Sequence, residues 1–151
     1  MGILIRFFTL AACCILISSG NVLAGGGTLK NLGNGICRDT VTGLEWQIEK
    51  SKRFSSRDEV KKYVAELHLG GHSDWRLPTT AETIGLRGLI AIQGNKDCGF
   101  SHLKGKYWMV DKKEGIVPAR LELECFCRGD FDLLVKDKGS VRVVRSTQVK
   151  K

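Results

Sequence analysis

Residues 70–82 constrain the fold of this chain more than any other stretch, because they join two helical patterns through a short rigid segment. The glycines at 70–71 follow a helical pattern and are expected to end it. Residues 75–78 are predicted to be extended, since the residue before a proline avoids helical angles. Thr79 and Glu82 then have the spacing of a capping box, which starts a helix. The stretch therefore predicts a hinge between two helices.

Apolar residues recur at helical spacing on both sides of this hinge. Before it, Ser56 and Glu59 provide another capping box, which predicts the start of the first helix. The apolar face of that helix is expected to consist of Val60, Tyr63, Val64 and Leu67. The second helix is expected to be weaker, because two glycines lie inside it and each costs roughly 1 kcal/mol relative to alanine. Its apolar residues are Ile84, Leu86, Leu89 and Ile90.

The rest of the chain has the alternation and turn residues of β-structure. Residues 36–39 and 44–47 predict a hairpin, with Trp46 in the core. Residues 93–106 are polar and contain glycine, which indicates a long loop. Later strands are expected at residues 107–110, 119–127, 131–136 and 141–144, with turns between them that include residues 128–130. This order of hairpin, two helices, loop and strands predicts the α+β class.

The first 24 residues are expected to be a signal peptide. Arg6 precedes an apolar run at residues 7–17, and Val22 and Ala24 supply the small residues of a cleavage site. Lipoprotein processing at Cys13 and a retained anchor are the alternatives, although the run is shorter than the roughly 20 residues of a membrane-spanning helix. The protein is therefore expected in the periplasm or outside the cell. The remaining chain divides into a flexible glycine-rich leader at 25–35, one domain at 36–146 and a tail at 147–151.

The chain is basic, which bears on its partners. It has 24 Lys and Arg against 16 Asp and Glu, a net charge of +8 that becomes +7 once Arg6 is removed. An excess of this size suits acidic partners such as sulfated or uronic-acid glycans, lipid headgroups or extracellular nucleic acid, of which nucleic acid is not expected here. Solubility alone is the alternative explanation. The positive residues are spread along the chain, so no basic tail is indicated.

Four cysteines remain after the signal peptide, and an even number in an exported protein predicts disulfides. Cys125 and Cys127 are two apart in an expected strand, so their side chains share a face but lie too far apart, since bonded Cβ atoms are about 4 Å apart. In both remaining pairings, Cys37 and Cys98 each bond to one of these two. A zinc site is disfavoured, because Cys125 and Cys127 lack the usual spacing of two to four residues and the export context favours disulfides. A redox or copper-dependent role for the two cysteines rests only on analogy and is also disfavoured. No metal or cofactor is expected.

Several motifs together resemble the Lcl C-terminal domain family, which is named after a collagen-like bacterial surface adhesin. They are Thr42-Gly43-Leu44-Glu45-Trp46, Asp74-Trp75-Arg76-Leu77-Pro78-Thr79, Tyr107-Trp108 and Val141-Arg142-Val143-Val144-Arg145. The resemblance covers about residues 36–146. Through residues 76–82 the chain is also similar to the formylglycine-generating-enzyme and C-type-lectin-like superfamily.

This resemblance implies a C-type-lectin-like fold. In such a fold two helices flank a mostly antiparallel sheet, and the N-terminal hairpin lies near the last strand. The calcium-dependent sugar motifs of lectins, Glu-Pro-Asn and Trp-Asn-Asp, are absent, so calcium-dependent sugar binding is not expected. Arg76 is expected to have a structural role, pairing with Asp74, Glu82 or backbone carbonyls. The residues expected to specify the fold are Trp46, Trp75, Arg76, Leu77, Pro78 and Glu82.

The best candidate for a binding surface lies on the loops around Trp108. Lys104 and Lys106 precede this residue, and Lys112 and Lys113 follow it. In a C-type-lectin-like fold these lysines are expected to converge at one end of the domain. Cations beside an aromatic ring suit a sulfated or acidic sugar. The alternative is that all four are ordinary solvated lysines.

Three functions are compatible with these patterns. The leading hypothesis is an exported, non-enzymatic module that binds a polyanionic glycan or a surface partner. The second is a structural or assembly protein of the cell envelope whose partner is another protein. The third is an oxidase derived from the formylglycine-generating type, which requires a free cysteine pair or a metal.

Overall fold

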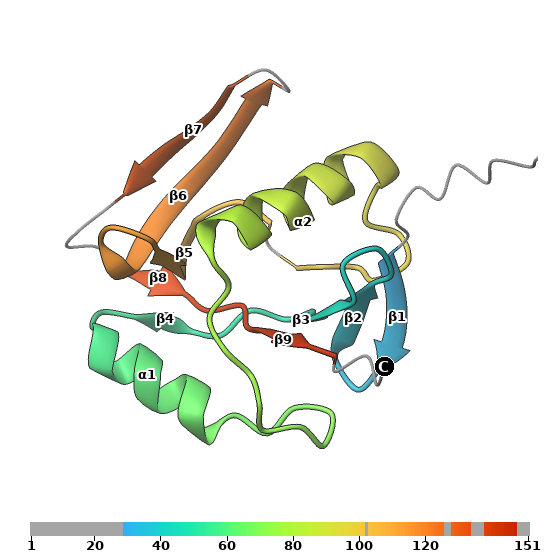
Figure 1. Ribbon diagram of the computed structural model, residues 1–151, viewed down its shortest axis with the longest axis horizontal. Coiled ribbons are helices and arrows are strands. Elements are labelled where there is room, and N and C mark those ends of the chain that lie inside the picture. The colour runs from blue at the N-terminus through green and yellow to red at the C-terminus, as the bar shows by residue number, and fades with distance from the viewer. Residues whose placement is uncertain (1–28, 102, 126–127, 134–137, 148–151) are drawn as a thin grey trace, which may run out of the picture.

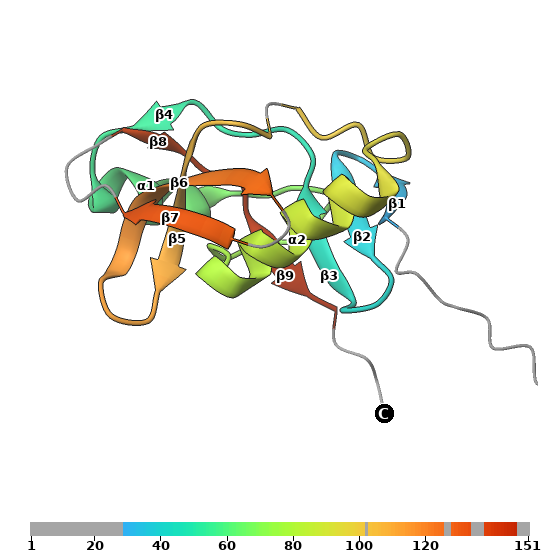
Figure 2. The same cartoon turned by 90° about the horizontal axis from the view of Figure 1, so that it is seen from above.

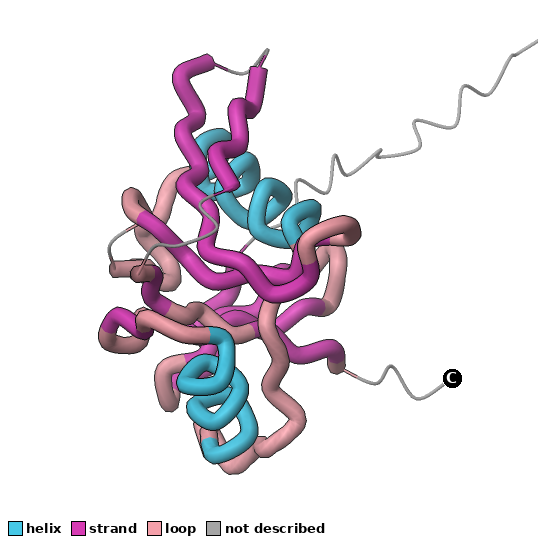
Figure 3. The backbone as a smooth tube through the Cα atoms, turned by 90° about the vertical axis from the view of Figure 1, so that its left-hand side faces the viewer, coloured by secondary structure: helices cyan, strands magenta, loops and turns pink. Residues whose placement is uncertain are grey.

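The computed structural model describes residues 29–101, 103–125, 128–133 and 138–147. Within these ranges it describes the side chains of all residues except 121–133. The expected signal peptide lies outside the described residues. The described part has an α+β fold, as predicted, with its two helices on opposite sides of the strands (Figures 1 and 3). It contains two mostly antiparallel sheets, whereas a single sheet was expected. Neither described helix has the length and apolar character needed to cross a membrane.

The first sheet has the strand order β1-β2-β3-β9 and is antiparallel throughout. The pairing of Trp46 with Val144 joins β3 to β9. The predicted N-terminal hairpin, β2 and β3, therefore lies beside the last strand, as the family resemblance implied. The strands of this sheet are β1 (Leu29–Gly33), β2 (Ile36–Asp39), β3 (Leu44–Gln47) and β9 (Val144–Ser146).

The second sheet has the strand order β4-β8-β5-β6-β7, in which only β5 and β8 pair in parallel (Figure 2). Pairing between β6 and β7 continues to Cys125 and Arg128, and Figure 1 shows this long hairpin extending away from the body. Residues 128–130 were expected to form a turn, but they lie in β7 because the ladder reaches that far. The strands are β4 (Arg53–Phe54), β5 (Lys106–Asp111), β6 (Gly115–Cys125), β7 (Arg128–Leu133) and β8 (Gly139–Ser140).

The strand expected at residues 141–144 is instead the crossing point between the two sheets. The chain leaves the second sheet after Ser140 and enters the first at Val144. Between them, the carbonyl of Val141 accepts the N–H of Ser51 at 2.9 Å, and that of Val143 accepts the N–H of Gln47 at 3.1 Å. Residues 141–143 are buried, and the β-branched valines at 141, 143 and 144 are what suggested one strand.

The predicted flexible leader is wrong over residues 29–35. Leu29 is 5% exposed and packs in the core, so the chain is anchored from this residue onward as β1. Gly33, Asn34 and Gly35 all have positive φ angles, between 50° and 79°. Glycine reaches such angles without steric cost, and asparagine reaches them more readily than most residues. The glycines thus make the tight turn into β2.

Both predicted helices begin at the expected caps. Helix α1 (Arg57–Glu66) has Ser56 as its N-cap, and α2 (Thr80–Gln93) has Thr79. In each case the hydroxyl accepts the backbone N–H three residues later, and the glutamate there accepts the backbone N–H of the cap. Each complete capping box satisfies two backbone donors that a helix end leaves unpaired.

The hinge between the helices is bonded to both sheets. Arg76 exchanges two backbone hydrogen bonds of 2.9 Å with Val144 in the first sheet, and the carbonyl of Pro78 accepts the N–H of Val110 at 2.9 Å in the second. Trp75 and Leu77 point into the core and are 5% and 7% exposed. The hinge is therefore a structural link between the sheets, as the expected fold-specifying residues suggested.

The disulfide pairing expected from the sequence is wrong. Cys37 in β2 is bonded to Cys98, which follows α2, with the two Cα atoms 5.8 Å apart. Leu86 and Ile90 of α2 pack in the same core cluster as Cys37, which places the end of the helix over β2. This packing across the chain brings the two cysteines together. Cys127 and the side chain of Cys125 lie outside what the structure describes.

Candidate anion-binding site

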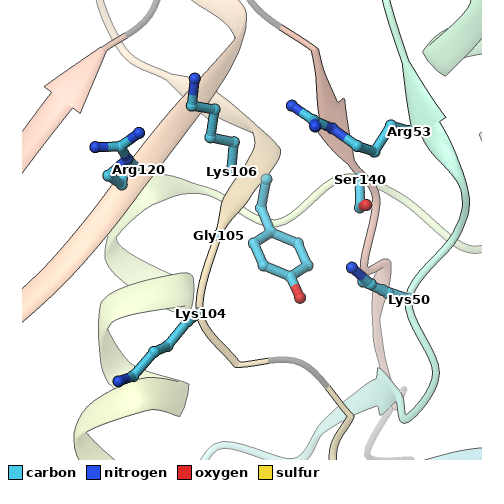
Figure 4. A pocket seen from close by; sticks show the side chains of 8 residues that line it. Lys50, Arg53, Lys104, Gly105, Lys106, Arg120 and Ser140 are labelled. Carbon is cyan, nitrogen blue, oxygen red and sulfur yellow. The ribbon is translucent and has the colours of Figure 1, made fainter.

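A surface pocket of about 260 Å³ lies across the second sheet (Figure 4). Five of its eight lining residues are cationic, and none of the eight is acidic. We call it the basic pocket. It is lined by Lys50, Arg53, Lys104, Gly105, Lys106, Tyr107, Arg120 and Ser140.

Strand order brings these residues together from distant parts of the sequence. Arg53 in β4 pairs with Ser140 in β8, and Ser140 pairs with Tyr107 in β5. One residue before Tyr107, Lys106 pairs with Arg120 in β6. With strands about 4.8 Å apart, the row from β4 to β6 spans roughly 14 Å. The pocket is thus a broad basic strip built on rigid strands.

The charged groups of three lining residues lie on the same side of the basic pocket in Figure 4. Figure 4 shows the ends of Arg53, Lys106 and Arg120 in the upper half of the view, whereas Lys50 and Lys104 lie lower. The Nη2 of Arg53 donates to the carbonyl of Lys138 at 2.8 Å, which holds this guanidinium at the rim. Among the described residues that line the basic pocket there is no carboxylate, and a lining of this charge favours an anion.

Tyr107 lies at the inner side of the basic pocket and is only 8% exposed. Burial raises the pKa of its hydroxyl, and the nearby charges of Arg142 and Arg87 do not offset that effect. The phenol therefore stays protonated at neutral pH and can donate a hydrogen bond. Arg142 packs against the Tyr107 ring, with its guanidinium carbon 5.4 Å from the ring centre.

The lysines expected to converge do so only in part. Lys104 and Lys106 line the basic pocket, but Lys112 and Lys113 belong to the turn between β5 and β6. The six residues of β5 separate the two pairs by roughly 20 Å. Four lysines in one site would require both ends of this strand to meet, which the extended backbone prevents.

Trp108 is a core residue and not a surface platform for a ligand. It is 3% exposed, and its Nε1 donates to the carbonyl of Phe54 at 3.4 Å. Alternation along β5 explains the difference, because neighbouring residues point to opposite faces of a sheet. The aromatic residue in the basic pocket is instead its neighbour, Tyr107.

Sequence reasoning missed three cations of the basic pocket. Arg120 is isolated between apolar residues and carries no local signal. Lys50 and Arg53 belong to the short basic run at residues 50–53, which is visible in the sequence. That run indicates a shared site with Lys106 only when the strand order β4-β8-β5 is known. In the described part of the chain, no three His, Cys, Asp or Glu side chains gather where they could hold a metal ion.

Comparison with known proteins gives one match. Neither the curated proteins nor the solved structures that were searched contain a match to this chain. The model of the Lcl C-terminal domain family matches residues 35–145, which is close to the range expected from the motifs and includes both helices and the hinge. This family is one of bacterial surface-type domains. The chain belongs to the Lcl C-terminal domain family.

Proposed function

We propose that this protein is an exported, non-enzymatic module that binds a sulfated or uronic-acid glycan in the basic pocket. The observation that carries the proposal is the convergence of five cations from separate segments, with no acidic residue in the lining. A lone basic run is often only a solvated surface, but the basic pocket is built by four adjacent strands. The C-type-lectin-like fold expected from the resemblance is part of the same proposal.

Charge and covalent chemistry support an exported glycan binder. The net charge attracts polyanions over long range, and the local cations provide the contacts. Arginine binds sulfate and carboxylate groups with two parallel N–H bonds, and both Arg53 and Arg120 line the basic pocket. The Cys37–Cys98 disulfide suits an oxidising compartment such as the periplasm or the cell exterior.

Heparin affinity tests the proposal with two variants of equal charge. In the pocket variant, Arg53→Gln and Lys104→Gln remove two positive charges from the basic pocket. In the control variant, Lys112→Gln and Lys113→Gln remove two charges from the distant turn. We expect the pocket variant to lose about fivefold or more in heparin affinity and to elute at lower salt, with the control close to wild type.

Two results would count against this function. Wild-type protein that is not retained on heparin at low salt rules out polyanion binding of useful strength. Equal losses in the two variants show that net charge, and not the basic pocket, is responsible. Circular dichroism and thermal unfolding of both variants check that neither change disturbs the fold.

A protein partner is the second candidate, favoured by a separate apolar groove of about 590 Å³. Val64 of α1, Leu77 of the hinge and Ile116 of β6 line it. This groove suits a partner with apolar side chains in an envelope assembly. Val64→Lys is then expected to abolish co-purification of one stoichiometric envelope protein, and heparin retention is expected to be unchanged.

A further inference from the structure

A small cavity lies on the inner side of Tyr107, apart from the surface groups of the basic pocket. Its volume is about 20 Å³, more than the roughly 10–15 Å³ that one water molecule needs but too little for a sugar ring. We call it the inner cavity. It is lined by Trp46, Pro78, Thr83, Leu86, Arg87, Leu103, Tyr107 and Arg142.

Two of its lining residues carry buried N–H donors without an acceptor. They are the Nε1 of Trp46 and the Nε of Arg142, on residues that are 2% and 6% exposed. The other two tryptophans satisfy the same atom, because Trp75 donates to the carbonyl of Leu69 at 3.2 Å and Trp108 donates to that of Phe54 at 3.4 Å. An unsatisfied buried donor costs about 1–3 kcal/mol, so two on one cavity require an explanation.

The guanidinium of Arg142 forms no close ion pair among the described residues, although the carboxylate of Glu49 stabilises its charge from farther away and the Tyr107 side chain hydrogen-bonds with it. Its Nη2 donates to the carbonyls of Ile48 and Ser101, at 3.0 and 2.5 Å, and its guanidinium packs between two aromatic rings. Both bonds go to neutral oxygens, and no described carboxylate forms an ion pair with this residue. Burying a charge without a close partner is costly, and Glu49 compensates this one only in part, so an anion beside it would be favoured.

The remaining lining strengthens the preference for a negative occupant. Arg87 supplies a second guanidinium, and burial lowers the pKa of both arginines, as expected for cations in a poorly hydrated space. The Thr83 hydroxyl already donates to the carbonyl of Thr79, and the carbonyl of Pro78 already accepts from Val110. A halide only accepts, which suits two N–H donors beside guanidinium groups, whereas a water molecule would also have to donate to the remaining lone pairs of the Thr83 hydroxyl and the Pro78 carbonyl.

We propose that the inner cavity binds one monatomic anion, with chloride as the physiological occupant. Trp46 Nε1 and Arg142 Nε are the donors that hold it, and the two guanidinium groups balance its charge. The site is distinct from glycan binding, because its volume is too small for a sugar ring. Its occupant would stabilise the contact of α2 with the first sheet, because Leu86 of α2 and Trp46 of β3 both line the inner cavity.

Thermal unfolding of the whole protein in different sodium salts tests this proposal. Chloride and bromide are compared with gluconate at equal ionic strength, so that general screening is held constant. We expect a saturable rise in Tm of about 2 °C or more with either halide, because a ligand that binds only the folded state stabilises it by mass action. Crystals grown in bromide should show one anomalous peak between Trp46 and Arg142.

Three variants locate the effect. Trp46→Phe keeps the ring but removes one donor, and we expect the apparent halide affinity to fall about tenfold or more. Trp75→Phe removes an indole N–H elsewhere and should keep the wild-type halide response. The Arg53→Gln, Lys104→Gln pocket variant should also keep it, which separates the inner cavity from the glycan site.

The alternatives give different results. Equal Tm values in halide and gluconate overturn the proposal. A Trp46→Phe protein that is more stable than wild type, with an unchanged halide response, shows that the donors are only unsatisfied or face water. If the pocket variant alone loses the response, the halide binds in the basic pocket and the inner cavity proposal is wrong.

Discussion

The carboxylate of Glu82 binds both Nη atoms of Arg76, at 2.8 and 2.6 Å, and also accepts the backbone N–H of its own helix cap, Thr79, at 2.8 Å. One side chain therefore closes the capping box of α2 and fixes the guanidinium of the hinge. Arg76 was expected to pair with Asp74, Glu82 or backbone carbonyls. It bonds to Glu82 and to the carbonyl of Leu77, while Asp74 pairs with Arg145.

Glu82→Gln is predicted to destabilise the protein by about 1–2 kcal/mol at neutral pH. Glutamine can still close the capping box, so this loss reports mainly the charged contact with Arg76. Glu82→Ala removes both and should cost about 0.5–1 kcal/mol more. Urea unfolding of the three proteins measures both differences, and equal losses in the two variants would contradict the separation of roles.

The same contact predicts a dependence of stability on pH. Hydrogen bonds from Arg76 lower the pKa of Glu82 from 4.5 to about 2, against the opposing effect of burial. A lowered pKa contributes stability that is fully present above pH 4.5 and is lost as the pH falls through about 2. The difference in unfolding free energy between wild type and Glu82→Gln should therefore shrink towards zero near pH 2. A constant difference from pH 7 to pH 2 would show that the charge of Glu82 is not responsible.

Arg145→Ala is predicted to cost about 2–4 kcal/mol of folding stability. Arg145 pairs with Asp74 at 2.7 Å and with Glu45, whose side chain is only 3% exposed. Burial alone would raise the pKa of Glu45, but hydrogen bonds from Arg38 and Arg145 outweigh it and lower the pKa. Arg145→Ala would leave Glu45 paired with Arg38 but without its second guanidinium, so the buried carboxylate would be less well compensated.

Lys62→Ala is the matched control for Arg145→Ala. The Nζ of Lys62 lies 4.0 Å from a carboxylate oxygen of Glu66, and the two side chains are 74% and 67% exposed. Exposed pairs of this kind contribute about 0.5 kcal/mol or less. Chemical unfolding should show a much larger loss of unfolding free energy for Arg145→Ala than for Lys62→Ala. Similar small losses in the two variants would mean that the ion pairs of Arg145 do not stabilise the fold.

Replacing both Cys37 and Cys98 by alanine is predicted to lower stability by about 4 kcal/mol. The bond closes a loop with a sequence separation of 61, and the loss of a cross-link of that length increases the entropy of the unfolded chain by about this amount. Peptide mapping without reduction should recover Cys37 joined to Cys98. Recovery of Cys37 joined to Cys125 or Cys127 would restore the pairing expected from the sequence and contradict the observed one.

Gly70→Ala is predicted to be more damaging than Gly71→Ala. Both glycines have positive φ angles, of +62° and +80°, so alanine is strained at either position. A Cβ at Gly70 would also lie 2.2 Å from the Cδ1 of Ile36, which is buried, whereas nothing lies within 4 Å of one at Gly71. Displacing this core side chain should add about 1–3 kcal/mol, and equal Tm losses would show that Ile36 adapts freely.

The elements that were predicted correctly depend on contacts between near neighbours in the chain. Ser56 and Glu59, like Thr79 and Glu82, interact across three residues, so their pattern identifies each helix start. The hairpin of β2 and β3 was equally local. By contrast, residues 29–35 were mistaken for a flexible leader, because the burial of Leu29 depends on packing with distant residues.

The basic pocket shows why the candidate site was only half predicted. Lys104 and Lys106 were found because they are close to an aromatic pair in the sequence. Arg53 and Arg120 join them through the strand order β4-β8-β5-β6, which no local pattern specifies. Trp108 was misplaced because the side of the sheet that faces the core was not known.

The sequence by itself determined the helix starts, the hinge at residues 75–78, the α+β class and the family. These follow from backbone preferences and from hydrogen bonds within a few residues. Only the tertiary structure decided that Cys37 bonds to Cys98, that the strands form two sheets, and which cations share the basic pocket. The physical reason is that strand order and helix packing are set by burying apolar faces from distant parts of the chain, and several arrangements satisfy the same local pattern.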